Sequence, residues 1–196
     1  MRVIRAFHFS NTLLVGAALL LAILPACSVN VKKESSGEEK QVDIKTPIGG
    51  IHVSKGADVA DTGLIVYPGA RLKEKDSDHD TSANVDISSF GFGLKVVALE
   101  YQSDDAPEKV TAFYQDQLKT YGSVLMCRTS GLDVDTDAKK SGSDSHALAC
   151  GHESGDSVEL KVGTKENQHI VAVQRDGKGS KFTLVYVRTH GKDADI

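Results

Sequence analysis

The clearest helical pattern in the chain begins just after residue 105, and it limits the fold more than any other feature. Apolar side chains return at helical spacing from Val110 onward, so they share one face of a helix. The residues of this face are Val110, Phe113, Tyr114, Leu118 and Tyr121. Asp105 with Glu108 three residues later is typical of a capping box, and Gly122 is a natural stop. The pattern predicts an amphipathic helix over residues 106–121, with Phe113 as a candidate core residue.

Strand-like runs lie on both sides of this helix. Before the helix they cover residues 41–45, 51–53, 64–67, 85–87 and 94–101. After the helix they cover residues 123–128, 146–150, 158–162, 170–174 and 182–188. Turn signals rich in Gly, Pro and Asp separate the runs, as expected for hairpins and meanders.

Side-chain alternation within these runs indicates the kind of sheet. In residues 158–162 the apolar side chains alternate with Glu159 and Lys161, which predicts an antiparallel strand with these two charges on a wet face. Residues 94–101 are apolar on both sides, which predicts a central strand. The fold class expected from this order is α+β, a mainly antiparallel sheet with one amphipathic helix packed on one face.

Size and charge narrow the classes of function. The chain has 196 residues, and the 170 that follow a 26-residue leader suffice for one domain, expected over residues 41–196. Subtracting the positive charges of Arg2 and Arg5 from the net charge of −4 leaves −6 for the remainder. Because nucleic-acid binding usually needs a basic patch, an acidic domain of this kind predicts no nucleic-acid partner.

The first 26 residues have the order of an export signal. Arg2 and Arg5 form a positive head, and residues 13–24 contain no charge. A spanning helix needs roughly 20 apolar residues, so this run is short for one. A positive head followed by a short apolar run predicts a secretory signal peptide over residues 1–26, and the alternative is a buried N-terminal helix.

The end of the apolar run resembles the lipobox of bacterial lipoproteins. The residues that carry the resemblance are Leu24, Pro25, Ala26 and Cys27: an aliphatic residue, a variable one, a small one and a cysteine. The resemblance implies cleavage before Cys27, acylation of this cysteine and anchoring to a lipid membrane, because two or three acyl chains hold a protein firmly. The alternative is an ordinary signal peptide that leaves Cys27 as a free thiol.

The residues after Cys27 are polar and charged. Residues 28–40 contain no aromatic side chain, so we expect a flexible tether between the anchor and the domain. Ser28 rather than Asp follows the cysteine. By analogy with bacterial sorting, the resemblance implies an envelope location facing the periplasm or cell exterior, with the outer membrane favoured over the inner.

Cys127 and Cys150 are the remaining cysteines. In an oxidising compartment we expect them to form a disulfide. The alternative is a zinc site that adds His146 and His152 as ligands, although the spacing matches no known finger.

Two acidic clusters resemble the start of a calcium loop only in part. Asp133, Asp135 and Asp137 alternate as the first ligands of an EF-hand do, but the Gly and Glu required later in that loop are missing. Residues 76–80 fail in the same way. These aspartates are weak metal candidates, and we expect them to lie in solvated acidic loops.

Catalytic motifs are missing from the sequence. There is no Gly-x-Ser-x-Gly, no HExxH, no phosphate-binding glycine loop and no dinucleotide fingerprint. We therefore expect no catalytic residue and no cofactor. An enzyme of unfamiliar type and a calcium-dependent adhesive module remain the alternative functions.

A wider resemblance covers roughly residues 64–128. The stretches VYPGA, YQSDD and EKVTAFYQDQLKTYG are similar to a pattern in uncharacterised bacterial secreted proteins and lipoproteins. The resemblance implies an envelope location and a single α+β unit, and it brings no activity with it. The expected function is therefore that of a membrane-anchored envelope lipoprotein acting by binding or structural association, with an envelope protein or a glycan as its partner.

Overall fold

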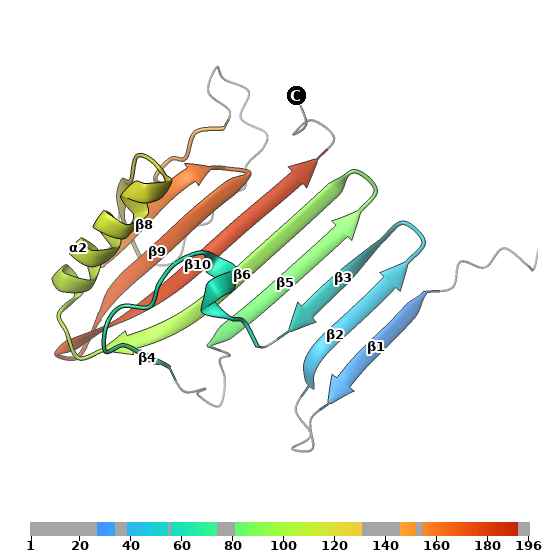
Figure 1. The fold of residues 1–196 in the computed structure, drawn as a ribbon, viewed down its shortest axis with the longest axis horizontal. Coiled ribbons are helices and arrows are strands. Elements are labelled where there is room, and N and C mark those ends of the chain that lie inside the picture. The colour runs from blue at the N-terminus through green and yellow to red at the C-terminus, as the bar shows by residue number, and fades with distance from the viewer. Residues whose placement is uncertain are drawn as a thin grey trace, which may run out of the picture.

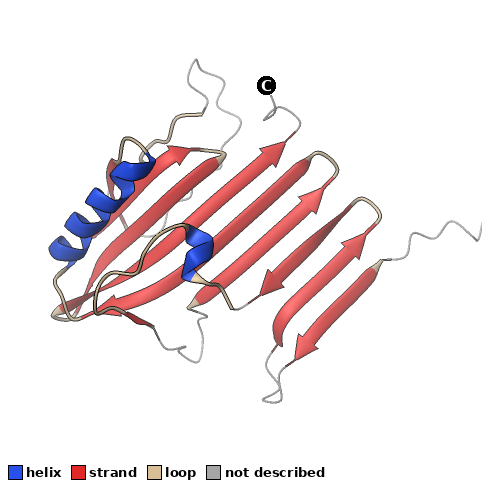
Figure 2. Cartoon of the chain, viewed as in Figure 1, coloured by secondary structure: helices blue, strands red, loops and turns tan. Residues whose placement is uncertain are grey.

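Among the residues that the structure describes, one large antiparallel sheet carries one α-helix (Figures 1 and 2). The computed structural model describes residues 27–33, 39–54, 56–73, 81–130, 146–151 and 155–191. Ten strands form the sheet, nine of them in the order β1-β2-β3-β5-β6-β10-β9-β8-β7, while the short β4 pairs with β6. Every pairing is antiparallel. The α+β prediction is confirmed.

The elements follow one another along the chain in a simple way. The strands before the helix are β1 (Ser28–Lys33), β2 (Glu39–Thr46), β3 (Gly49–Ser54), β4 (Arg71–Leu72), β5 (Ser82–Ser89) and β6 (Phe92–Ser103). The helix α2 (Pro107–Leu118) continues as the 3-10 turn η2 (Lys119–Tyr121). The strands after it are β7 (Leu125–Thr129), β8 (Ser157–Thr164), β9 (Asn167–Asp176) and β10 (Gly179–Gly191). A second 3-10 turn, η1 (Val59–Thr62), lies between β3 and β4.

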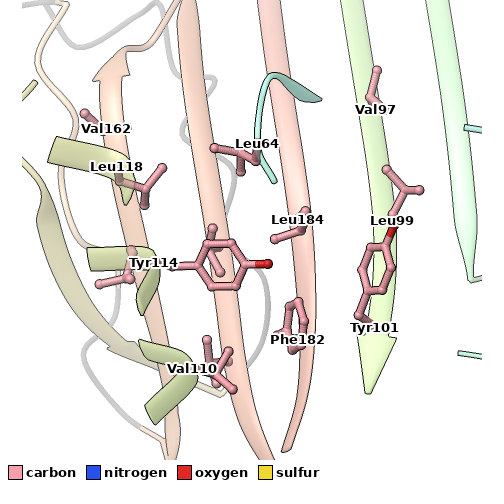
Figure 3. Packing of buried hydrophobic residues seen from close by; sticks show 13 residues of the cluster. Leu64, Val97, Leu99, Tyr101, Val110, Tyr114, Leu118, Val162, Phe182 and Leu184 are labelled. Atoms are coloured by element: carbon pink, nitrogen blue, oxygen red, sulfur yellow. The ribbon is translucent and has the colours of Figure 1, made fainter. Parts of the chain in front are cut away.

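The main core lies between α2 and the sheet. Figure 3 shows Val110, Tyr114 and Leu118 of α2 pointing at apolar side chains of the strands. The core residues are Leu64, Val97, Leu99, Tyr101, Val110, Tyr114, Leu118, Leu160, Val162, Val171, Val173, Phe182 and Leu184. The helix contacts β8, β9 and β10, while η1 contacts β6 and β10. The prediction that residues 94–101 form a central strand is confirmed, because β6 has β5 on one side and β10 on the other.

The helix departs from its predicted form at both ends. Its first turn has no capping box, because Ala106 is the N-cap and makes no side-chain cap bond. The Asp105 carboxylate instead accepts hydrogen bonds from Lys109 Nζ at 2.7 Å and from the Tyr67 hydroxyl at 2.9 Å. At the other end the last residues tighten into η2, and Tyr121 is 44% exposed, with its hydroxyl donating to the Gly63 carbonyl.

Two predicted strands are irregular in the structure. Residues 64–67 form a loop, because the Ile65 carbonyl and the Tyr67 N–H bind the Tyr114 hydroxyl instead of a neighbouring strand. Residues 147–151 also lack regular structure, and a disulfide from Cys150 to β7 holds them. Local alternation favours a strand in both places, but partners far away in the sequence decide the outcome.

The tether predicted over residues 28–40 is wrong where the structure describes it. Residues 28–33 form the edge strand β1, which pairs with β2, and β2 itself begins at Glu39. The reason lies in the register: Val29 faces Ile44 and Val31 faces Val42 across the two strands. Apolar pairs of this kind stabilise a strand that looks too polar in isolation.

The sheet extension formed by β1, β2, β3 and β5 has one apolar and one polar face. One apolar row runs through Val29, Ile44, Ile51, Ile87 and Leu94, and a second runs through Val31, Val42, Val53, Val85 and Val96. The polar face carries the row Asn30, Asp43, His52, Asp86 and Lys95. The helix lies on the polar-face side of the sheet, over other strands, so the apolar rows face away from it.

The charges of β8 are not on a wet face as predicted. Glu159 and Lys161 point away from α2, yet both are fully buried, and Lys161 Nζ lies 3.4 Å from Glu159 Oε2. Cys127 lies opposite Glu159 in register, and its disulfide brings the segment of Cys150 to this side. Mutual neutralisation makes the burial of two charges tolerable.

Candidate functional site

Cys27 lies at the surface, directly before the edge strand β1. It is exposed and free of any disulfide. The next residue, Ser28, pairs with Lys45 near the end of β2, so Cys27 lies at the end of the sheet where the β2–β3 turn lies. Any group attached to Cys27 is therefore joined to the folded sheet without an intervening linker. The signal predicted over residues 1–26 lies outside the described residues, and no helix among those described is long and apolar enough to cross a membrane.

The disulfide prediction is confirmed for Cys127 and Cys150. The two sulfurs are 1.98 Å apart and the two Cα atoms 5.5 Å apart. Because this bond uses both thiols, neither is free in this structure to serve the alternative zinc site. His146 instead places Nδ1 2.8 Å from Glu166 Oε1, while His152 lies outside the described residues. In the described ranges no group of three or more His, Cys, Asp or Glu side chains could hold a metal ion.

Asp133, Asp135 and Asp137 lie outside the described residues, and so does the acidic stretch 76–80.

A cleft runs beside α2, and sequence reasoning did not predict it. Its volume is about 520 Å³, within the range of small-ligand sites. Its lining is shared between the exposed side of the helix and three strands: Pro107, Glu108, Thr111, Ala112, Gln115, Met126, Arg128, Asp156, Val158, Val173 and Arg175. Of these residues Val173 is buried and Val158 is partly buried, so they form an apolar floor, while Glu108, Arg128 and Arg175 are exposed and form a charged rim. This combination suits a ligand with both apolar and hydrogen-bonding groups.

The two arginines at the rim of the cleft differ in their ion pairing. Arg175 of β9 donates to Glu108 of α2, with an Nη2–Oε1 distance of 3.0 Å. Arg128 of β7 has no such ion pair among the described residues. A guanidinium carries five donors in a planar fork that matches a carboxylate or phosphate. Arg128 is therefore the side chain of the cleft best suited to hold an anionic group.

The start of α2 is fixed by a small network, which keeps the helical wall of the cleft in place. The hydrogen bonds from Lys109, and next from Tyr67, hold the pKa of the Asp105 carboxyl below its usual value. The Asp105 carbonyl also accepts a bond from the Ser180 hydroxyl at 2.9 Å, which ties the start of the helix to β10. The position of Glu108 at the rim follows from this network.

One Asp–His pair on the polar face has the contact of a catalytic dyad. His52 Nδ1 lies 2.6 Å from Asp43 Oδ1, and this hydrogen bond lowers the pKa of Asp43. Asp86 stands next to His52 in register on β5. A catalytic dyad also needs a nucleophile bonded to the imidazole, and none of the described hydroxyls or thiols makes a hydrogen bond to His52. The pair fits a cross-strand contact in a polar row.

A second histidine is part of the packing between η1 and the sheet. His169 is nearly buried, and its Nδ1 lies 2.9 Å from the Thr62 carbonyl oxygen. Its ring contacts those of Tyr121 and Tyr186, with centroids 4.1 and 5.1 Å away. Burial lowers the pKa of His169. Because its Nδ1 is hydrogen-bonded to the Thr62 carbonyl, this histidine holds the loop before β4 against β9.

Comparison of the chain with protein-family models, with curated proteins and with solved structures finds no match.

Proposed function

We propose that the chain is a membrane-anchored lipoprotein of the bacterial envelope that works by binding, with the cleft beside α2 as its binding site. The observation that carries the binding role is the cleft itself, with an apolar floor and the guanidinium of Arg128 at its rim. Acylated Cys27 would hold the domain at the outer membrane, facing the periplasm or cell exterior. The Cys127–Cys150 disulfide supports an oxidising compartment, where such bonds persist.

The ligand that best suits the cleft carries a carboxylate on an extended, partly apolar framework. Arg128 would hold the carboxylate in a bidentate manner. Val158 and Val173 would contact the apolar part, while Thr111 and Gln115 offer further hydrogen bonds. Such a ligand could be a segment of an envelope protein or an acidic glycan. Binding is favoured over catalysis because the Asp43–His52 pair comes without a bonded nucleophile in the described part of the chain.

The anchor is tested by replacing its cysteine. Cys27→Ser should abolish incorporation of labelled palmitate and release the chain from the membrane fraction, because the substitution removes the attachment site of every acyl chain. Ser28→Ala, one residue away, should leave both properties unchanged. Equal labelling of the wild-type chain and the Cys27→Ser variant would show that the anchor proposal is wrong.

The binding site is tested by photo-crosslinking in intact cells. A photo-reactive amino acid at Ala112, in the cleft, should give a discrete adduct, and the same group at exposed Lys119 should not. Arg128→Glu should reduce the Ala112 adduct by at least about tenfold, since a charge-assisted hydrogen bond contributes roughly 1.5–3 kcal/mol. Arg188→Glu, an equal change of charge outside the cleft, is the control. Protease or glycosidase digestion of the adduct tells a protein segment from a glycan, and identical adducts at both positions would contradict the proposed site.

A further inference from the structure

Two tight turns at the end of the sheet next to Cys27 carry large apolar side chains. In the β2–β3 turn Ile48 is 67% exposed, and in the β5–β6 turn Phe90 is 85% exposed. Phe92, at the start of β6, is 46% exposed. Turns of this kind usually carry Gly, Asn, Asp or Ser, and an isolated exposed apolar residue needs no explanation. Three together at one end of a sheet do need one. We call Ile48, Phe90 and Phe92 the apolar tip.

The two turns lie side by side and next to the anchor. The Phe90 N–H donates to the Ile48 carbonyl at 3.0 Å, so one hydrogen bond joins them. Cys27 precedes β1, whose Ser28 pairs with Lys45 close to the β2–β3 turn. Since β1 and β5 are separated by three strand spacings of about 4.8 Å, Cys27 lies roughly 15 Å from the start of the β5–β6 turn, and Ile48 in the β2–β3 turn lies nearer.

The tip is built as a defined structure. The Thr46 hydroxyl donates to the Gly49 carbonyl at 2.9 Å, across the β2–β3 turn. A side chain at position 49 would bring its Cβ to 2.1 Å from the Ser88 carbonyl oxygen, so only glycine allows this approach of the two turns. The backbone of the two turns is therefore fixed, and this fixed backbone holds the side chains of Ile48 and Phe90 out into solvent.

The two turns of the apolar tip suit hydrocarbon, in contrast to the β8–β9 turn at the same end of the sheet, which carries Lys165 and Glu166. Residues 46–49 and 88–92 contain no charged side chain. Behind the turns an apolar hollow of about 210 Å³ opens onto the apolar face, and its lining includes Ile44, Ile51 and Ile87. Because a charge placed in a bilayer is costly, a segment free of charge with aromatic side chains can enter the membrane interface.

We propose that the apolar tip inserts into the same bilayer that holds the acyl chains of Cys27. The proposal rests on the proposed acylation of Cys27, which would bring the tip to the membrane surface with no linker between. It also gives the domain an orientation. β6 runs from the tip at Phe92 to Ser103, about 36 Å away at 3.3 Å per residue, and Pro107 and Arg175 of the cleft lie near that far end. The cleft would then open away from the membrane, where an envelope ligand can reach it.

The chain offers a direct test because it contains no tryptophan. Phe90→Trp places a single indole at the tip, and Phe92→Trp is a second variant should the first fail to fold. Leu72→Trp is the matched control, since Leu72 is 47% exposed and pairs with Tyr101 at the far end of β6. Each full chain, purified from membranes, is reconstituted in vesicles of phosphatidylethanolamine, phosphatidylglycerol and brominated phosphatidylcholine. Flotation and palmitate content of the same samples report on the anchor.

The outcomes separate the tip from the anchor. We expect bromine to quench Phe90→Trp emission at least roughly twofold more than Leu72→Trp emission, as for an aromatic side chain at the membrane interface. Equal quenching in chains that are acylated and float would overturn the inference and leave the anchor standing. A chain that has no palmitate and does not float would contradict both the acylation of Cys27 and the insertion of the tip. A blue shift of Phe90→Trp that needs no vesicles and grows with protein concentration would show that a second copy covers the tip, which also overturns the inference.

Discussion

Tyr114→Ala is expected to lower the free energy of unfolding by about 3–5 kcal/mol, the usual cost of removing a large buried aromatic side chain. Tyr114 is fully buried at the centre of α2 (Figure 3). Its ring centroid lies 5.1 Å from that of Phe113 and 5.5 Å from that of Phe182. Burial also raises the pKa of its hydroxyl, because the charged form would be poorly solvated there.

The conservative variant Tyr114→Phe isolates the role of the hydroxyl. This hydroxyl accepts from the Tyr67 N–H at 2.9 Å and donates to the Ile65 carbonyl at 3.1 Å. Its loss would leave two backbone groups without their partner, at about 1–3 kcal/mol for each group that stays buried. Urea unfolding followed by far-UV circular dichroism measures both variants.

Phe113→Ala is the matched comparison for Tyr114→Ala. The sequence makes Phe113 a candidate core residue, but the structure leaves it half-buried at the edge of the core, stacked edge-on against Tyr67. Its removal should therefore cost less than that of Tyr114. If Phe113→Ala destabilised the chain more than Tyr114→Ala, the placement of α2 on the sheet would be wrong.

The difference between these neighbours shows how far periodicity can go. Helical spacing predicts that both residues lie on one apolar face of the helix, and this prediction is confirmed. The apolar face of the helix is wider than the area that the sheet covers. Helical spacing alone therefore does not tell which apolar residue of this face lies at the centre of the core. That depends on where β9 and β10 pass beneath the helix, which is a property of non-local pairing.

The same limit explains the errors at the edges of the fold. Val29 and Val31 form a pattern of only two apolar residues among polar and charged ones, and their strand exists because Ile44 and Val42 lie opposite. In the loop 64–67 the alternation is better, yet the hydroxyl of Tyr114, almost 50 residues later in the chain, takes the backbone groups that a ladder would use. Strand propensity reflects packing against neighbours, and those neighbours are distant in sequence.

The candidate site was even less accessible to sequence reasoning. Cys27 could be singled out because its signal is local, a motif of four residues at the end of an apolar run. The cleft combines Glu108, Arg128 and Arg175 from a helix and two strands, and no spacing relates them. The one available signal was the exposed side of α2, whose small and polar residues Thr111, Ala112 and Gln115 leave space at the sheet edge.

Replacing both cysteines of the disulfide, Cys127→Ala with Cys150→Ala, is expected to lower the free energy of unfolding by about 3 kcal/mol, the chain-entropy value for a loop of this length. The bond joins residues 23 positions apart. It also ties the irregular segment 147–151 to β7, an edge strand of five residues whose only strand partner in the described sheet is β8. Loss of the bond should thus raise hydrogen exchange in β7 more than in the central β6 and β10.

The measurement is cleanest in a chain that also carries Cys27→Ser, because Cys127 and Cys150 are then the only cysteines left. Reductant should lower its urea midpoint and leave the midpoint of the triple variant unchanged. Arg128 follows Cys127 directly on β7, so the loosening of this strand should also weaken the crosslink formed from Ala112. An unchanged midpoint under reduction would mean that strand pairing with β8 alone holds this edge. An unchanged crosslink despite a lowered midpoint would separate the cleft from the disulfide, and Arg128 would then owe its position to Val158, its partner in register on β8.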